Sequence, residues 1–489
     1  MNRRVVLICA ALFAPLAYAD AGWFESGDLP LRADLQLLND AEVVRLPLNQ
    51  WPLPRAAVAY ALEHSREHFA TNPAVATALA RVRGRMAAHD GLSWSARVAA
   101  GEPGTWRDFD TLARSEGEIT GGVVWRSARA EVSLRATVSK DPADGRDVIP
   151  DGSHATVQLG NWLLSANTLD RWWGPAHEGG LLLSNNARPM PALFVERAAA
   201  KPFESAWLNW LGPWRFSFGV GQMEDDRGDV DSPLFLMWRV AVMPFKDIEL
   251  GISRTAQFCG KQLRCTLNVF GNLLAGNDNV GIDSRPEDEP GNQMAGFDIR
   301  WASPVGDWPY AIYSQMIGED ESSYMPAKFL SQFGVETWKP FADGGFLQGH
   351  AEYASTTCSG NSSRGPYYNC AYNQGRFDVE GYRYYGRTVG YTSDRDAENW
   401  AVGADYIEPD GTAWSVVARK SRFNRDNFGD VLNTVASVPT SYAALEFGWK
   451  GEFRGQNFSV DLGVETLEPA REDREVSAFG FLNWVYEFH

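Results

Sequence analysis

The stretch from Arg171 to Pro189 carries the side chains best suited to recognise a sugar. Aromatic rings cover the C–H faces of a pyranose, and amides, carboxylates and guanidinium groups pair with its hydroxyls. A tightly hydrogen-bonded structural loop is the equally open alternative. The candidate polysaccharide contacts in this stretch are Arg171, Trp172, Trp173, His177, Glu178, Asn185, Asn186 and Arg188.

No catalytic constellation accompanies this stretch. His177-Glu178 lacks the second histidine of an H-E-x-x-H motif, and the chain has neither a G-x-S-x-G nor a G-x-x-x-x-G-K-[ST] motif. The seven histidines are scattered along the chain. We therefore expect a protein that is not an enzyme and that needs no cofactor.

An acidic loop offers one possible cation site. Glu224, Asp225 and Asp226, with Asp229 and Asp231, could supply the carboxylate oxygens that Ca²⁺ prefers. A solvated loop, partly neutralised by Arg227, is the favoured interpretation, and the Asn277-Asp278-Asn279 turn is interpreted in the same way. We expect no bound metal.

The first 19 residues have the pattern of a secretory signal. Arg3 and Arg4 precede an apolar run from Val5 to Leu16, and Ala17-Tyr18-Ala19 forms an A-x-A cleavage site. This run is too short to span a membrane as a helix, and no later apolar segment is long enough. We expect the mature chain to begin at Asp20.

Charge and cysteine usage agree with export. The 489 residues include 45 basic and 62 acidic side chains, a net charge of −17, which argues against nucleic acid as a partner. Cys9 leaves with the signal. The other cysteines form two local pairs without C-x-x-C spacing or nearby histidines, which favours disulfides over metal in an oxidising compartment: Cys259 with Cys265 and Cys358 with Cys370.

Residues 20–91 differ from the rest of the chain and predict a small helical subdomain. Leu31, Leu35 and Leu38 share one helical face. Asn72-Pro73 has the pattern of a helix start, with Asn72 as the N-cap, and Gly91 is typical of a helix end. These apolar stripes require a surface to pack on, which the rest of the chain must supply.

From 92 to 489 the hydrophobic period changes to two, with no convincing helix. Val132, Leu134, Ala136 and Val138 alternate with polar residues, and similar segments recur to the C-terminus between turn signals such as Pro409-Asp410-Gly411. Alternation alone does not separate a soluble β-structure from a membrane barrel, because both have one apolar face.

Three features favour a bacterial outer-membrane barrel over a β-propeller or a β-sandwich enzyme. The apolar positions are rich in aromatic residues near strand ends, and the other positions carry charged and small residues suited to a wet lumen. The chain closes with alternating aromatics from Trp484 to Phe488, before His489. At about ten residues per strand plus loops, this region predicts ~16–20 antiparallel strands.

The chain resembles the Wzi-type capsule assembly proteins of the Gram-negative outer membrane. The resemblance rests on the following stretches, in family order: Leu31 to Asp40, Trp51-Pro52-Leu53-Pro54, Arg171-Trp172-Trp173-Gly174-Pro175, Ser184-Asn185-Asn186-Ala187-Arg188-Pro189, Gly221 to Arg227 and Ser253 to Gln257. It covers nearly the whole mature chain. The Arg-Trp-Trp-Gly-Pro and Ser-Asn-Asn-Ala-Arg-Pro motifs are the most specific.

This resemblance implies a mainly β fold: a transmembrane β-barrel of ~18 strands with a small α-helical bundle on its periplasmic side and a largely blocked lumen. It implies a lectin-like protein that binds capsular or extracellular polysaccharide and assists its attachment and assembly at the cell surface. Outer-membrane lipid and other polysaccharide export components are the further partners it implies.

Several points remain open at the level of sequence. Tyr367 and Tyr368, beside Cys370, are a second set of candidate sugar contacts on an outer loop. Arg171, Glu178 and Arg188 could instead form an ion-pair network that plugs the barrel. A porin-like channel for sugars or anions, or a carbohydrate-active enzyme on a β-scaffold, are the alternative functions.

Overall fold

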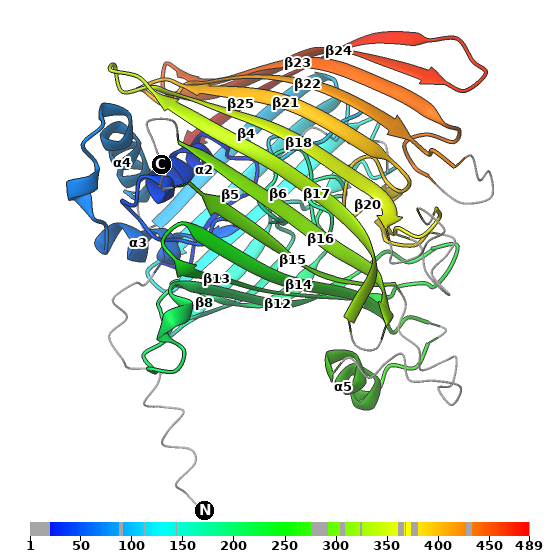
Figure 1. Ribbon diagram of the computed structural model, residues 1–489, viewed down its shortest axis with the longest axis horizontal. Helices are drawn as coiled ribbons and strands as arrows, with labels where there is room; N and C mark the ends of the chain where they lie inside the picture. Colours follow the sequence, from blue (N-terminus) through cyan, green and yellow to red (C-terminus); the bar gives the residue numbers. More distant parts are fainter. Residues whose placement is uncertain are drawn as a thin grey trace, which may run out of the picture.

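The computed structural model describes residues 20–87, 91–111, 114–142, 144–261, 263–275, 292–303, 309–322, 325–359, 366, 368–372, 380–426 and 433–488. The expected signal peptide, the Asn277–Asn279 turn and Tyr367 lie outside the described residues. Within the described part of the chain, eighteen strands close into one antiparallel barrel, and the two-residue strand β7 shares with β8 the place beside β6 (Figure 1). The predicted barrel is therefore confirmed.

The wall strands have the following bounds: β4 (Gly91–Glu102), β5 (Gly117–Ser127), β6 (Ala130–Lys140), β7 (Val148–Ile149), β8 (His154–Leu159), β9 (Trp162–Asn167), β11 (Ala192–Arg197), β12 (Trp214–Gln222), β13 (Leu234–Phe245), β14 (Ile248–Phe258), β15 (Gln293–Ala302), β16 (Tyr310–Ser322), β17 (Met325–Pro340), β18 (Phe346–Ser359), β21 (Glu398–Ile407), β22 (Ala413–Phe423), β23 (Thr440–Phe453), β24 (Gln456–Pro469) and β25 (Glu475–Phe488).

The last strand closes the barrel on the first one. β25 pairs antiparallel with β4, from Gly480 opposite Glu102 to Phe488 opposite Trp94. The terminal aromatics therefore belong to a paired strand, so the barrel has no open edge at this seam.

Side chains alternate between the two faces of the wall, as the period of two predicts. Trp400 and Val402 of β21 are 60% and 63% exposed on the outer face. Arg239 of β13 and Asp298 of β15 are buried inside, where Nη1 and Nη2 of the arginine bind the two carboxylate oxygens of the aspartate. The barrel is thus apolar outside and ionic inside.

The helical head occupies one end of the barrel, visible at the left of Figure 1. Its helices are α2 (Leu29–Asp40), α3 (Arg55–Glu63) and α4 (Pro73–Met86). Asn72 caps α4 through the backbone N–H of Ala74, as predicted, although the helix ends at Met86 and Gly91 begins β4. Wall residues anchor the head, because Arg300 binds Asp40 and Arg81 donates to the carbonyl oxygens of residues 408 and 409.

The lengths of the connections distinguish the two ends. At the head end the turns are short, as between Phe245 and Ile248 or Phe453 and Gln456. At the opposite end the chain makes long excursions, such as the one from Phe258 to Gln293. Short turns face the periplasm in barrels of the bacterial outer membrane, whereas long loops face outward, so we call the opposite end the outer end.

One expectation about the barrel region is wrong. A helix, α5 (Leu267–Ala275), interrupts the strands in the long connection between β14 and β15. Its Leu273 is buried in an apolar cluster with Leu236 and Phe258 at the outer end, and its Phe270 packs against this cluster. A tertiary apolar surface therefore supports a helix that the sequence pattern did not indicate. None of the described helices has the length and apolar character needed to cross a membrane.

Candidate functional site

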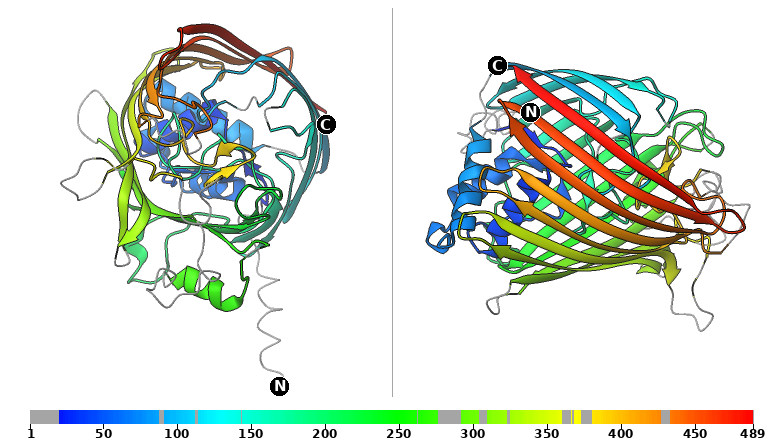
Figure 2. Two further views of the ribbon diagram at one scale, coloured as in Figure 1. Left: turned by 90° about the vertical axis from the view of Figure 1, so that its right-hand side faces the viewer. Right: turned by 90° about the horizontal axis from the view of Figure 1, so that it is seen from above.

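The connection between β9 and β11, residues 168–191, contains the candidate sugar-binding stretch and lies inside the barrel. Its short strand β10 (Trp172–Trp173) pairs with β2 (Gln50–Trp51) from the head. The left view of Figure 2 looks into the barrel from the outer end and shows connecting segments across the ring of strands, with the helices of the head behind them. We call residues 168–191 the lumen segment.

Arg171 is held by the wall. Its Nη1 and Nη2 bind the two carboxylate oxygens of Glu196 on β11, each at 3.1 Å. The guanidinium also lies 3.2 Å from the centroid of the Phe194 ring. Arg171 and Glu196 are 7% and 1% exposed, so the pair is enclosed by protein.

The two adjacent tryptophans pack in different apolar cores. Because neighbouring residues on a strand point to opposite faces, Trp172 packs with the apolar core of the head and Trp173 with the apolar core of the lumen. Phe109 contacts the ring of Trp172 edge-on, with centroids 5.4 Å apart. Both tryptophans are 0% exposed.

His177 and Glu178 join a buried network that spans the barrel. His177 Nε2 lies 2.9 Å from Glu336 on β17, and its ring stacks on His350 of β18 with centroids 4.3 Å apart. Glu178 accepts from Arg419 of β22 at 2.5 Å and lies 3.2 Å from His350 Nε2. These contacts tie the lumen segment to distant parts of the wall.

The same network contains a group with the composition of a metal site. One possible ligand atom each from His177, His350 and Asp405 lies within 4.8 Å of the others. The two imidazole planes, however, are parallel within 5°. Their in-plane lone pairs therefore cannot converge on one ion without rotation of a ring, so the geometry does not favour coordination.

The two asparagines bind backbone groups of other segments. Asn185 Nδ2 donates to the carbonyl oxygen of Phe109 at 2.7 Å, and its Oδ1 lies 3.1 Å from Ser26 Oγ. Asn186 Nδ2 donates to the carbonyl oxygen of Thr388 at 2.8 Å. Each amide donates to a carbonyl group that is buried away from water and would otherwise lack a partner. The two asparagines therefore join the lumen segment to other chain segments inside the barrel.

Arg188 lies where the lumen segment returns to the outer end. It forms ion pairs with Asp144 at 2.6 Å and Asp151 at 3.4 Å, both in the connection between β6 and β8. Its guanidinium carbon is 5.8 Å from the centroid of the Tyr385 ring. Among the eight residues proposed in this stretch, Arg188 is the one that also lines a large cavity at the outer end.

That cavity, which we call the outer pocket, has a volume of about 440 Å³. Residues from four separate connections line it, so it is a product of the folded outer end. The lining residues are Arg146, Pro150, Asp151, Thr168, Arg188, Pro189, Pro191, Gln222, Met223, Glu224, Asp225, Ser232, Tyr384 and Tyr385.

Tyr385 and Glu224 give the outer pocket its chemistry. The half-buried Tyr385 ring has Arg146 over one face, 4.7 Å from its centroid. Glu224 Oε1 accepts from the Tyr385 backbone N–H at 2.9 Å, whereas its Oε2 is buried without a hydrogen-bond partner. Burial raises the pKa of the Glu224 carboxyl, although Arg227 opposes this effect. An unpaired buried oxygen beside an aromatic ring is suited to a hydroxyl-bearing ligand.

Arg227 organises part of the acidic loop through ion pairs. Arg227 Nε binds Asp229 at 2.8 Å, and its Nη1 lies 3.3 Å from Glu224. Arg227 also donates to the carbonyl oxygens of Gly381 and Arg383. Arg227 thus neutralises part of the loop, as predicted, and Asp225 and Asp226 are exposed to solvent. The prediction of a solvated loop is wrong for Glu224 and Asp229, whose side chains are buried with Arg227.

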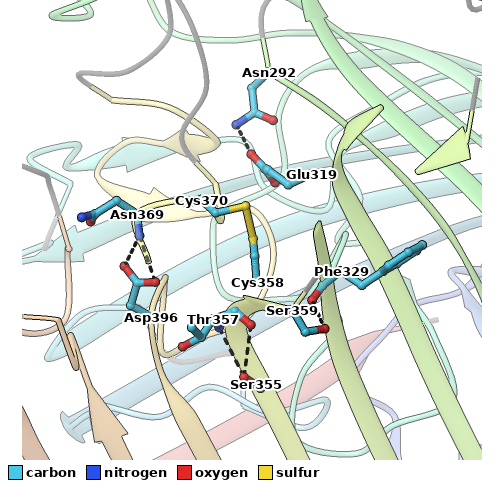
Figure 3. Close-up of a disulfide and its surroundings, with 10 residues drawn as sticks. All are labelled: Asn292, Glu319, Phe329, Ser355, Thr357, Cys358, Ser359, Asn369, Cys370 and Asp396. Carbon is cyan, nitrogen blue, oxygen red and sulfur yellow. Dashed lines mark hydrogen bonds between the residues drawn. A yellow bond between two sulfur atoms is a disulfide. The ribbon is translucent and has the colours of Figure 1, made fainter. Parts of the chain in front are cut away.

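Both predicted cysteine pairs are disulfides, Cys259–Cys265 and Cys358–Cys370. Figure 3 shows the second one joining the end of β18 to the loop that carries Asn369, whose backbone N–H donates to Asp396 at 2.9 Å. Tyr368 in this loop is 41% exposed. The structure thus places Tyr368 on the outer surface, outside the lining of the outer pocket.

Sequence reasoning did not identify Tyr384 and Tyr385. Tyr384 ends the short strand β19 (Arg383–Tyr384), and Tyr385 follows in the turn before β20 (Arg387–Thr388). Both are far along the chain from Arg188 and Glu224. Two adjacent tyrosines within Tyr382 to Tyr385 were the available signal, but nothing in their spacing connects them to the lumen segment. Conversely, all eight proposed residues bind or pack against protein groups, and Arg188 alone among them also lines the outer pocket. The role of the eight as sugar contacts stays a prediction.

Comparison with known proteins places this geometry in context. The profile of the capsule assembly protein Wzi family matches residues 82–476. A 55.8 kDa protein from the cps region of Klebsiella pneumoniae is 31% identical over 342 residues, which cover 68% of this chain. The chain spans 65% of the length of that relative.

A solved structure is also similar over almost its full length. It is Wzi, an outer membrane protein involved in group 1 capsule assembly in Escherichia coli and a carbohydrate-binding β-barrel. The two chains are 25% identical, with a TM-score of 0.81, and the match covers 96% of this chain and 99% of that one.

Proposed function

Because this chain belongs to the Wzi family of capsule assembly proteins, we propose that it binds capsular or extracellular polysaccharide and assists its attachment and assembly at the cell surface. It is an outer-membrane protein, as its similarity to Escherichia coli Wzi and its closed barrel indicate. We place the sugar-binding site in the outer pocket, on the side where exported polysaccharide lies.

The observation that carries this placement is the unpaired Glu224 Oε2 beside the Tyr385 ring. The half-buried ring offers an apolar face to the C–H groups of a pyranose. The carboxyl oxygen can accept from a sugar hydroxyl, which would remove the cost of leaving it without a partner. A volume of about 440 Å³ is in the usual range for small-ligand pockets.

The proposed residues divide by position. Arg188 borders the outer pocket and is offered as a sugar contact, and the exposed Tyr368 as a second contact farther along a long polymer. The other seven, together with their buried partners, would hold the lumen segment so that Arg188 reaches the outer pocket. Those seven are Arg171, Trp172, Trp173, His177, Glu178, Asn185 and Asn186.

The proposed function involves binding without chemistry. A glycosidase commonly places two carboxyl groups on either side of the scissile bond, one of them protonated. In the outer pocket Asp151 is paired with Arg188, and the Oε1 atom of Glu224 with Arg227. A carboxyl group beside a guanidinium group is less suited to act as a proton donor. Other export components remain proposed partners, and the head is the natural contact for those in the periplasm.

Binding of purified polysaccharide tests this proposal. Tyr385→Ala removes the aromatic face, and a contact of ~0.5–1.5 kcal/mol corresponds to a ~2–12-fold increase in Kd. The measurement is biolayer interferometry of the detergent-purified barrel with surface polysaccharide from the source strain, compared with that of an unrelated strain.

The matched control is Tyr310→Ala, which removes a 39% exposed tyrosine from the first residue of β16, at the head end. We expect it to leave the Kd unchanged. An unaltered Kd for Tyr385→Ala, with normal heat-modifiable mobility of the folded barrel, would remove the outer pocket as the binding site. Failure of the wild-type barrel to bind any polysaccharide would reject the function itself.

A further inference from the structure

The connection between β11 and β12 exposes large apolar side chains that the barrel wall does not cover. Trp207 is 87% exposed, Trp210 65% and Leu208 41%. We call residues 203–211 the tryptophan spur. Such exposure of a contiguous aromatic group marks a surface that contacts something other than water.

The spur has a defined local structure. Ser205 O accepts from the N–H groups of Leu208 and Asn209, at 3.1 and 2.9 Å, and the chain then forms the 3-10 helix η2 (Asn209–Leu211). Gly212 ends the helix with a φ of 65°, and a Cβ there would lie 2.0 Å from Met243 O of β13. The spur is therefore fixed against the wall, and its tryptophans are presented in a set position.

The spur is rooted on the outer face of the barrel wall. Arg215 and Ser217 face the lumen and are 2% and 0% exposed, so Trp214 faces outward on the alternating strand. The Phe203 ring stacks on Trp214, with centroids 4.3 Å apart and planes within 10°. Arg197, the outward neighbour of the lumen-facing Glu196, lies 3.7 Å over the same Trp214 ring. Spur and lipid-facing wall thus form one continuous surface.

The depth of the spur follows from its neighbours. Lys201 Nζ lies 5.9 Å from the ring centroid of Tyr60 in α3, which places the root of the spur at the head end. In an outer-membrane barrel this end borders the periplasmic, phospholipid leaflet. Tryptophan is enriched at the membrane–water interface, and cationic side chains such as Arg197 and Lys201 complement the phosphates of a lipid headgroup.

We propose that the tryptophan spur is a membrane-interface anchor that inserts Trp207 and Trp210 among the phospholipid headgroups of the inner leaflet. This inference goes beyond polysaccharide binding and is independent of it. The anchor would fix the depth of β11 and β12 in the membrane, because withdrawing the two tryptophans into water would expose their apolar area again.

Site-directed spin labelling tests this proposal on the full barrel. The four described cysteines are in disulfides, so a nitroxide can be attached selectively to Trp210→Cys. The labelled barrel is reconstituted into phosphatidylethanolamine–phosphatidylglycerol vesicles, and collision with oxygen and with a water-soluble nickel chelate is measured. We expect several-fold less nickel collision than for a label at Glu67→Cys.

Glu67 is a suitable control because it lies in the head with a side chain 61% exposed. Because Trp210 is 65% exposed, its replacement should leave the barrel folded, which heat-modifiable mobility verifies. Equal nickel collision at residues 210 and 67 would place the spur in water and overturn the proposal. A surface for a periplasmic protein would then be the remaining explanation of its exposure.

Discussion

Replacement of Arg171 separates a structural role of the lumen segment from direct sugar contact. Arg171→Met keeps a long apolar stem but removes the guanidinium that holds both oxygens of Glu196. Because Glu196 is 1% exposed, its charge is left buried without its cationic partner. Breaking a buried pair in this way costs ~3–5 kcal/mol.

A double variant isolates the pair. In Arg171→Met/Glu196→Gln both charges are gone, so we expect the double variant to be more stable than Arg171→Met alone, with a coupling of ~1–3 kcal/mol. Glu196 also accepts from Ser217, an interaction that a glutamine side chain can keep. The assay is urea unfolding of the barrel in detergent micelles, followed by tryptophan fluorescence.

The same variants report on sugar binding under conditions where they remain folded. We expect the Kd for surface polysaccharide to stay within about twofold of wild type, because Arg171 is 7% exposed and lies outside the lining of the outer pocket. A variant of unchanged stability that no longer binds polysaccharide would refute this reasoning, since Arg171 would then be a contact and not a support.

Three further outcomes are expected. In planar bilayers the purified barrel should show no large steady conductance, because the lumen segment and residues 380–397 fill the interior that the wall encloses. A large steady conductance would support the porin-like alternative. Replacing Cys358 and Cys370 with alanine removes a crosslink of sequence separation 12, which should lower the local stability of the connection between β18 and β21 by ~3 kcal/mol. Proteinase K should then cut this connection faster on intact cells, and an unchanged cleavage rate would contradict this. For Glu224, whose pKa is raised in the folded state, the stabilising contribution is present below the unfolded pKa and is lost as pH rises through the folded pKa. The Tm of Glu224→Gln should therefore rise relative to that of wild type between pH 4 and pH 7.5. A Tm difference that is the same at both pH values would show that burial does not raise the pKa of Glu224.

The fold could be predicted because its signal is local. A period of two, aromatic residues near strand ends and a terminal aromatic strand each follow from one strand facing lipid on one side and a polar lumen on the other. The start of α4 at Asn72-Pro73 was equally local, because one side chain caps one backbone N–H. Helix α5 was missed because its stability depends on the wall surface that covers Phe270 and Leu273.

The site could be predicted only in part, for the same reason. The lumen segment was identified by its composition, but composition does not say whether Arg171 binds Glu196 or a sugar. The outer pocket joins Glu224 and Tyr385, which the chain separates by 161 positions. Without that juxtaposition neither residue suggests a sugar site, because an isolated acidic loop and a pair of tyrosines are common surface features.

The contacts of the lumen segment also set the order in which this barrel can be assembled. Glu178 precedes β11, yet its partner Arg419 follows it by 241 residues, on β22. Contacts of such long range form late, because the intervening chain must first be brought together. Until β22 is in place, Glu178 of the lumen segment and Arg419 each lack the other as a partner. Closure of the wall and packing of the lumen segment inside it are therefore coupled steps. A chain that ends before β22 would leave Glu178 without Arg419 and its interior open to periplasmic proteases.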